Sequence, residues 1–391
     1  MTTLKLSDYD MSAERGFLCR HTPADVKLTG GLAKAREVAM DLPALLQAGN
    51  VRTHLMDGLP DLSCESFAGL SDAEARMAMV HYAFMVQAYM WGEPGTPTVL
   101  PKNLAVPMVA LSKHLGQPPI MSYSVYVLDN WGKLDKAGPI GLDNLYLVQK
   151  FLSGQDESWF ILVHVAIEAR AGACLALMGD IVDAANQEDI EKTRSLLEET
   201  AQVWVDLRPL FNRMPERCDP HIYFQNIRPY LHGWKDNPEL PNGLIYEGVE
   251  EFGNKPQYFR GQTGSQSSIV PAMDALMGVG HAADPLKAYL DQLHIYRPPA
   301  HRRFIDDLRA KSKLRAFVTK SGNKALAEAY NANVQAVSDF RSLHLEYAAK
   351  YISNQSSKQK RNDPNIGTGG TPFMKYLKKH RDETQANLVS V

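Results

Sequence analysis

The chain has 391 residues, 45% of them hydrophobic and 22% charged, and its 42 basic and 44 acidic side chains leave a formal net charge of −2. This length and composition are typical of a globular protein with two domains, or with one large domain and an appendage. Because neither charge sign forms a long run, the sequence argues against nucleic-acid binding and against attachment to a membrane surface.

The cysteines and the N-terminus indicate a reducing compartment. Cys19, Cys64, Cys174 and Cys218 are scattered and lack the spacing of a zinc site, so we expect free thiols. Residues 1–8 lack the apolar core of a signal peptide, and no apolar run reaches the roughly 20 residues that span a bilayer. We therefore expect a cytoplasmic protein without membrane contact.

Helical periodicity dominates the first 140 residues. Ser71, followed by acidic residues, predicts the N-cap of a helix over 71–91. Residues 100–107 (LPKNLAVP) predict a proline-bracketed turn before a helix over 107–115. The polar stretch over 132–141, which contains Gly and Pro, predicts a domain boundary near residue 140.

The rest of the chain is predicted to form longer helices, because apolar residues recur in it at spacings of three and four. The expected ranges are 158–185, 187–211, 219–231 with an interruption at Pro229, 267–278, 284–294, 299–312, a helix from 326 that carries His344, and 372–384. We predict an all-α protein with a small, mainly helical N-terminal domain (1–140) and a large all-α domain (141–391).

The helix that carries His344 has two polar residues on its apolar stripe. The stripe runs through Leu326, Tyr330, Val334, Val337, Arg341, His344, Ala348 and Tyr351, always at spacings of three or four. A buried cation beside a buried imidazole needs an anionic or metallic partner. Iron porphyrin would supply both, as a metal for His344 and propionates for Arg341. The alternative is a core histidine bonded to a carbonyl group, with Arg341 paired to an acidic side chain.

Another histidine lies on the predicted helix over 158–185. His164 and Glu168 are four residues apart, so they share a helix face. They could hydrogen-bond to each other, or both could bind a metal such as non-haem iron. The spacing leaves both alternatives open.

Two further segments could bind an anion. Arg228 lies near Tyr223 and Phe224, and an arginine between aromatic rings suits an aromatic ligand with a carboxylate. A structural arginine at a helix end is the alternative. The loop over 259–268 (FRGQTGSQSS) could present hydroxyl and backbone NH groups to a carboxylate, or it could only cap a helix.

Eight segments in the same order resemble the indoleamine 2,3-dioxygenase family of haem enzymes. They are LPKNLAVP (100–107), PPI (118–120) with NW (130–131), IRPYLHGWK (227–235), LIYEG (244–248), GQTGSQSS (261–268), YRPPAHR (296–302), RSLHL (341–345) and GTGGT (367–371). The resemblance covers about residues 100–384. It implies that the domain over 141–391 binds haem b and is catalytic.

The resemblance also implies a role for each site residue. His344 would be the proximal ligand of the haem iron, and Arg341 would lie near a propionate and pair with Asp274. Arg228 would hold the substrate carboxylate, with Tyr223 and Phe224 beside it. The other expected site residues are Thr263 and Gly264 over the haem edge, Thr371 in a mobile lid, and Tyr123, Tyr126 and Phe160 in the apolar pocket.

Two positions depart from the pattern of well-known animal members. They have a serine at the position of His164 and a cysteine at that of Tyr126. A distal histidine is similar to the related tryptophan 2,3-dioxygenases, where an imidazole can accept a hydrogen bond from the indole NH group. The chain is identified as a bacterial-type member of the family with a distal histidine, which we expect to be a catalytic residue together with Arg228.

The activity that the resemblance implies is oxidative cleavage of the indole C2–C3 bond of L-tryptophan by O2, which gives N-formylkynurenine. An unidentified electron donor would keep the iron ferrous. Two alternatives remain at this point: an enzyme of the same fold that acts on a different or modified indole in secondary metabolism, and a non-catalytic haem-binding protein.

Overall fold

A computed structural model describes residues 4–356 and 361–390. The described residues form fourteen α-helices and four short strands, which confirms the all-α prediction. The α-helices are α1 (Gly30–Met40), α2 (Leu42–Ala48), α3 (Val51–Gly58), α4 (Asp72–Trp91), α5 (Lys102–Leu115), α6 (Gln155–Asn186), α7 (Ile190–Asn212), α8 (Pro220–Ile222), α9 (Ile269–Met277), α10 (Pro285–His294), α11 (Pro299–Lys311), α12 (Leu314–Ser321), α13 (Lys324–Ala348) and α14 (Phe373–Gln385). The strands are β1 (Val99–Leu100), β2 (Trp131–Lys133), β3 (Leu145–Leu147) and β4 (Ile245–Tyr246).

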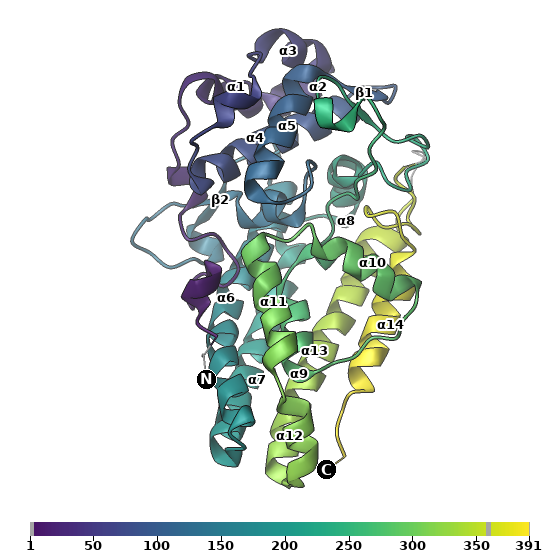
Figure 1. Cartoon of the computed structure of the whole chain (residues 1–391). Helices are drawn as coiled ribbons and strands as arrows, with labels where there is room; N and C mark the ends of the chain where they lie inside the picture. Colours follow the sequence, from purple (N-terminus) through teal and green to yellow (C-terminus); the bar gives the residue numbers. More distant parts are fainter. Residues whose placement is uncertain (1–3, 357–360, 391) are drawn as a thin grey trace.

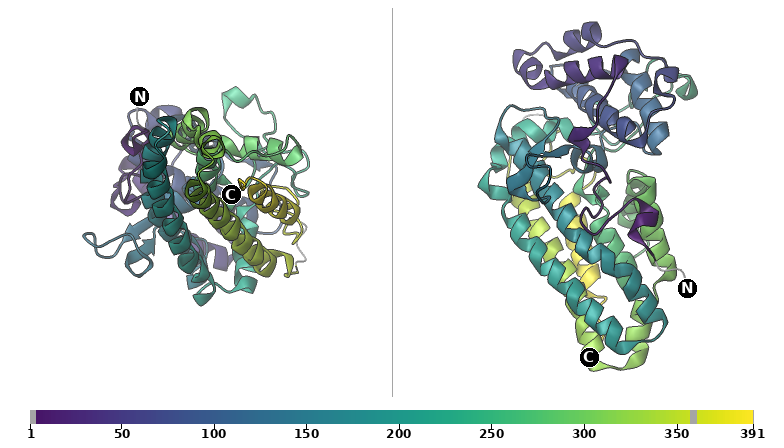
Figure 2. Two further views of the ribbon diagram at one scale, coloured as in Figure 1. Left: turned by 90° about the horizontal axis from the view of Figure 1, so that it is seen from below. Right: turned by 90° about the vertical axis from the view of Figure 1, so that its left-hand side faces the viewer.

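The long helices α6, α7, α13 and α14 run side by side (Figure 1). The contacts among them are extensive, with α7 packed against both α6 and α13, and α14 packed against α13. The helices α1–α5 gather at one end of this bundle (Figure 2). The division into domains at residue 140 stays a prediction. At the start of the described chain, the hydroxyl of Tyr9 donates a 2.5 Å hydrogen bond to Asp307 of α11.

Helix α6, with 32 residues, is the longest helix of the bundle. It is long and apolar enough to cross a membrane by those two criteria alone, but 67% of its most apolar window is buried inside the protein. The N-terminal segment crosses it at Gly172 and Gly179. A Cβ atom on Gly172 would lie 2.3 Å from the carbonyl oxygen of Ala13, and one on Gly179 would lie 2.4 Å from that of Leu4. Only glycine allows the two backbones to approach this closely.

Several predicted boundaries are confirmed and others are wrong. Ser71 caps α4 through a capping box, in which its Oγ accepts from the NH group of Glu74 while the Glu74 carboxylate accepts from the NH group of Ser71. The predicted turn over 100–107 is instead the beginning of α5, which starts at Lys102 and contains Pro107. Pro107 therefore lies inside the helix and not at its start, which a helix tolerates where neighbouring contacts compensate for the lost hydrogen bond.

The predicted helix over 219–231 is broken into three short pieces. Helix α8 is followed by the π-helix η7 (Tyr223–Ile227) and the 3-10 helix η8 (Arg228–Leu231). Two further π-helices are η4 (Ser124–Leu128) and η11 (Ala349–Ser353). Such turns change the direction in which consecutive side chains point, and they are frequent at functional sites.

The strands form only two short two-stranded sheets. Strands β1 and β4 pair in parallel, so they join the start of α5 to the loop before α9. Strands β2 and β3 form an antiparallel hairpin, and the polar stretch over 132–141 lies in it. Neither pair forms a layer of its own.

Candidate functional site

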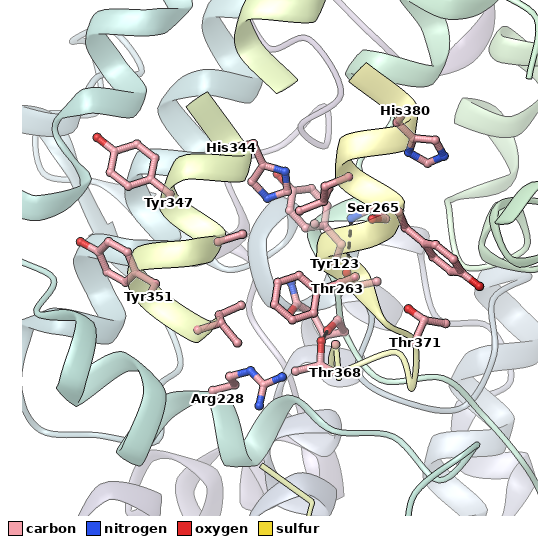
Figure 3. Close-up of a pocket in the computed structure, with 18 of the residues that line it drawn as sticks. Tyr123, Arg228, Thr263, Ser265, His344, Tyr347, Tyr351, Thr368, Thr371 and His380 are labelled. Carbon is pink, nitrogen blue, oxygen red and sulfur yellow. Dashed lines mark hydrogen bonds between the residues drawn. The ribbon is translucent and has the colours of Figure 1, made fainter. Parts of the chain in front are cut away.

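Two adjoining cavities lie among α6, α7, α13, α14 and the loop that precedes α9. Their volumes are about 650 and 130 Å³, and His164, His344, Phe211 and Gly264 belong to the walls of both. The larger volume lies within the range of small-molecule and cofactor sites. Figure 3 shows His344 near one end of the drawn side chains and Arg228 near the other, with Tyr123 and Thr263 between them in this view.

His344 of α13 presents a neutral imidazole to both cavities. Burial, and to a lesser degree the proximity of the second imidazole at His164, lowers the pKa of His344 to about 4. None of the described residues forms a hydrogen bond with either of its ring nitrogens. A Cβ atom on Gly264 would lie 3.9 Å from its Nε2, so the glycine leaves free the space in which a larger side chain would crowd that nitrogen. A neutral imidazole with a free nitrogen is the form that ligates iron.

These features fit a haem group. The larger cavity has apolar side chains in its wall, and the free imidazole of His344 supplies an iron ligand. Arg341 lines the same cavity one turn from His344 and can face an acidic edge of the cofactor. The core-histidine alternative, in which a carbonyl group binds His344, is not what the structure shows.

Arg341 is ion-paired with Asp274 of α9, and the shortest distance between the two groups is 2.7 Å. Asp274 also accepts a 3.3 Å hydrogen bond from His281. Burial alone would raise the pKa of Asp274, but the charge of Arg341 and the contact with His281 lower it to about 2. The guanidinium is therefore fixed at the wall of the larger cavity.

His164 of α6 is also neutral. Its Nδ1 lies 2.7 Å from the carbonyl oxygen of Phe160, and burial lowers its pKa. A carbonyl oxygen only accepts, so Nδ1 carries the hydrogen and Nε2 is left as an acceptor. The tautomer therefore makes His164 a hydrogen-bond acceptor in the cavity wall.

His164 and Glu168 do not bond to each other, which excludes the His–Glu hydrogen bond that their spacing allowed. Glu168 instead accepts hydrogen bonds from the hydroxyls of Tyr123 (2.9 Å) and Ser267 (2.8 Å) through Oε1. Its Oε2 is buried and has no partner. Burial raises the pKa of Glu168 to about 7, more than the two hydroxyl groups lower it.

Arg228 is fully buried and has no acidic partner within 4 Å among the described residues. Its guanidinium donates to the Asn362 side chain and to the carbonyl oxygen of Ile366, while Nε is buried without a partner. It lies over the ring of Phe224, 5.4 Å from the ring centre. Burial lowers the pKa of Arg228 to about 10, so the group is still cationic at neutral pH. A buried cation without a counter-ion favours the binding of an anion.

Three segments of the site cross backbone to backbone at Gly261. A Cβ atom there would lie 2.3 Å from the carbonyl oxygen of Leu231, 2.4 Å from the NH nitrogen of Gly233 and 2.6 Å from the carbonyl oxygen of Thr368. These neighbours belong to the segments that carry Arg228 and the GTGGT loop. Glycine is required at this crossing because no side chain fits between the chains.

The structure brings most of the predicted site residues together. The smaller cavity is lined by Tyr123, Phe160, His164, Tyr223, Arg228, Thr263, Gly264, His344 and Thr371. The larger one is lined by Tyr123, His164, Gly264, Asp274, Arg341 and His344. Two predicted residues do not reach either wall. Tyr126 is fully buried against Phe84, with ring centres 5.7 Å apart, and Phe224 lies beneath the Arg228 guanidinium.

Several wall residues are not predicted from the sequence. Helix α14 supplies Phe373, Tyr376, Leu377 and His380, and α10 supplies Tyr289 and Leu290. Those of α14 recur at spacings of three and four, which is the signal that could have identified them.

Comparison with known proteins points to one family. The family model described as "Indoleamine 2,3-dioxygenase" matches residues 5–387. The chain is 34% identical to indoleamine 2,3-dioxygenase 2 of Homo sapiens, over 99% of this chain and 96% of the human protein. It is 35% identical to indoleamine 2,3-dioxygenase 1 of Rattus norvegicus (90% and 88% covered) and 32% identical to indoleamine 2,3-dioxygenase of Saccharomyces cerevisiae (97% and 93% covered).

Proposed function

Because this chain belongs to the indoleamine 2,3-dioxygenase family of haem-dependent oxidoreductases, we propose that its substrate is L-tryptophan. Both atoms of O2 would enter the product as the indole C2–C3 bond breaks, which gives N-formylkynurenine. We place the enzyme in the cytoplasm, where an electron donor keeps the iron ferrous. The cofactor is haem b, whose iron supplies the activation of dioxygen when it is bound.

The burial of the Arg228 guanidinium without an acidic partner is the observation that supports an amino-acid substrate. Its buried guanidinium lacks a carboxylate partner and opens onto the cavity that also contains His344. The carboxylate of tryptophan would complete the charge pair, and a bidentate contact would fix its direction. The rings of Phe160 and Tyr223, with centres 4.7 Å apart, form an aromatic wall for the indole.

The remaining residues hold the cofactor and orient the indole. His344 would ligate the haem iron, and Arg341, held by Asp274, would face a propionate. His164 would accept a hydrogen bond from the indole NH group through Nε2. The protein's own work is thus binding, orientation and exclusion of water, to which the neighbouring Thr263 and Thr371 segments contribute as parts of the cavity wall.

A second candidate is the cleavage of a different or substituted indole. Its support is His164, a polar ring in the part of the cavity where well-known animal relatives are expected to have a serine. A substituent on the indole nitrogen would replace the NH hydrogen, so the indole could no longer donate a hydrogen bond to the His164 imidazole. The first candidate therefore requires a substrate with a free indole NH group, and the second does not.

The test is turnover by the haem-loaded, reduced protein with O2. L-Tryptophan, D-tryptophan and substituted indoles are supplied in parallel, and products are identified by mass spectrometry. Many turnovers of L-tryptophan to N-formylkynurenine per haem would support the proposal. Turnover only of a substituted indole would favour the second candidate, and a normal ferrous haem spectrum without any product would indicate a non-catalytic haem protein.

A further inference from the structure

A cluster of metal-binding side chains lies at the wall of the larger cavity, which His281 and His380 help to line. His380 and Glu383 are one turn apart on α14, and His281 lies in the loop between α9 and α10. One ligand atom from each of the three lies within 4.8 Å of the others. We propose that His281, His380 and Glu383 bind a zinc ion, separate from the haem iron.

The first support is an unsatisfied nitrogen. Nε2 of His380 is buried and has no hydrogen-bond partner. A buried ring nitrogen without a partner is costly, and a metal ion would satisfy it. Figure 3 shows His380 on α14, among the residues that line the pocket with His344.

The second support is the set of groups that orient the ligands. Nδ1 of His281 lies 2.6 Å from the carboxylate of Glu383, while its Nε2 lies 3.3 Å from Asp274. A metal ion taken up between Nδ1 and Glu383 would leave Nε2–H as the donor to Asp274. This is the carboxylate–histidine–metal arrangement typical of zinc sites. The other oxygen of Glu383 accepts from the NH group of Ala282 at 3.3 Å, which orients that ligand too.

The local charge also suits a divalent cation. Three carboxylates, those of Asp274, Asp284 and Glu383, lie in this network with two cations, Arg341 and Lys379. Both ring nitrogens of His281 face carboxylates, so zinc would displace a proton from this ring, and the network would then have one excess negative charge to balance the ion. Two imidazoles and a carboxylate suit zinc better than magnesium or calcium, which prefer oxygen ligands. The ion would join α14 to the loop after α9, directly behind Arg341.

Metal analysis of the haem-loaded protein tests the proposal. The protein is first dialysed against a chelator, which leaves the haem iron in place, and then against micromolar free zinc. We expect one zinc per chain in addition to the haem iron. Because zinc would join two elements, we also expect the melting temperature to rise with zinc and to fall again with the chelator.

Two variants and a control give the proposal its specificity. His380→Leu removes the unsatisfied nitrogen, and Glu383→Gln removes a charged ligand with little change in volume. Each should weaken zinc binding by about tenfold or more, as measured by titration calorimetry. His221→Leu is the control, because His221 is exposed on α8, outside the cluster. Absence of zinc from the wild-type protein, or equal zinc binding by wild-type and variants that keep their haem spectrum, would overturn the proposal.

Discussion

The imidazoles of His164 and His344 flank one aromatic ring. The centre of the Phe211 ring lies 6.3 Å from that of His164 and 6.2 Å from that of His344. Helix α7, which carries Phe211, packs against both α6 and α13. Two neutral imidazoles from different helices thus open onto the same space, which allows one to bind a metal and the other to accept a hydrogen bond.

Replacement of His344 by glycine should abolish stable haem binding. The variant removes the only iron ligand that we assign, so the Soret band of the reconstituted protein should weaken strongly. Added imidazole should restore part of it, because the small molecule can occupy the vacated space. The control is His221→Gly. A normal ferrous spectrum of His344→Gly without imidazole would show that another residue ligates the iron.

Replacement of Arg228 by alanine should weaken the use of L-tryptophan. Loss of a bidentate charge pair should cost about 2–4 kcal/mol of transition-state stabilisation, which appears as a lower kcat/KM caused mostly by a higher KM. Tryptamine, which lacks the carboxylate, is the matched control, since its turnover should change far less. Equal effects on both substrates would show that Arg228 supports the fold rather than the carboxylate.

Replacement of His164 by alanine should remove the preference for a free indole NH group. One neutral hydrogen bond is worth about 1 kcal/mol, so the wild-type protein should favour L-tryptophan over 1-methyl-tryptophan by about fivefold or more. In His164→Ala the preference for L-tryptophan over 1-methyl-tryptophan should disappear. An unchanged ratio in His164→Ala would mean that Nε2 does not accept from the indole.

Glu168 should make the protein less stable as the pH rises. Its pKa is about 7 in the folded protein and about 4.3 in an unfolded chain, so unfolding releases a proton between these values. The stability contributed by the protonated group is complete below about pH 4 and is lost as the pH rises through 7. Glu168→Gln should therefore gain about 2–3 kcal/mol relative to wild type between pH 5 and pH 8.

Melting temperatures of wild type and Glu168→Gln across that pH range provide the measurement. Glu199→Gln, at an exposed position of α7, is the control and should follow the wild-type curve. Parallel curves for all three proteins would contradict the raised pKa of Glu168.

The sequence predicted best where one helix face decides the outcome. The regular stripe of their helix predicts His344 and Arg341 as site residues, and the apolar run over 159–167, interrupted only by His164, predicts α6. The roles of Tyr123 and Tyr126 could not be separated. The π-helix η4 begins between them, and it directs Tyr123 to the cavity and Tyr126 to Phe84. A π-turn depends on tertiary packing, so spacing alone does not predict it.

The contribution of α14 to the cavity was also beyond the sequence analysis. The sequence predicts that α14 has an apolar face, but which element packs against that face depends on how the chain returns to α13 after residue 371. The partners of Glu168 were likewise unpredictable, because Tyr123 and Ser267 are 45 and 99 residues away.

The crossing at Gly261 has a mechanical consequence. Where side chains separate two segments, a small shift of one is absorbed by rotamer changes in the other. At this crossing the carbonyl and NH groups of three segments are in direct contact, so no side chain lies between them that could absorb a shift by changing its rotamer. A displacement of the GTGGT loop should therefore also move the segment that carries Arg228, so the position of the loop and the binding of an anion by Arg228 are mechanically coupled.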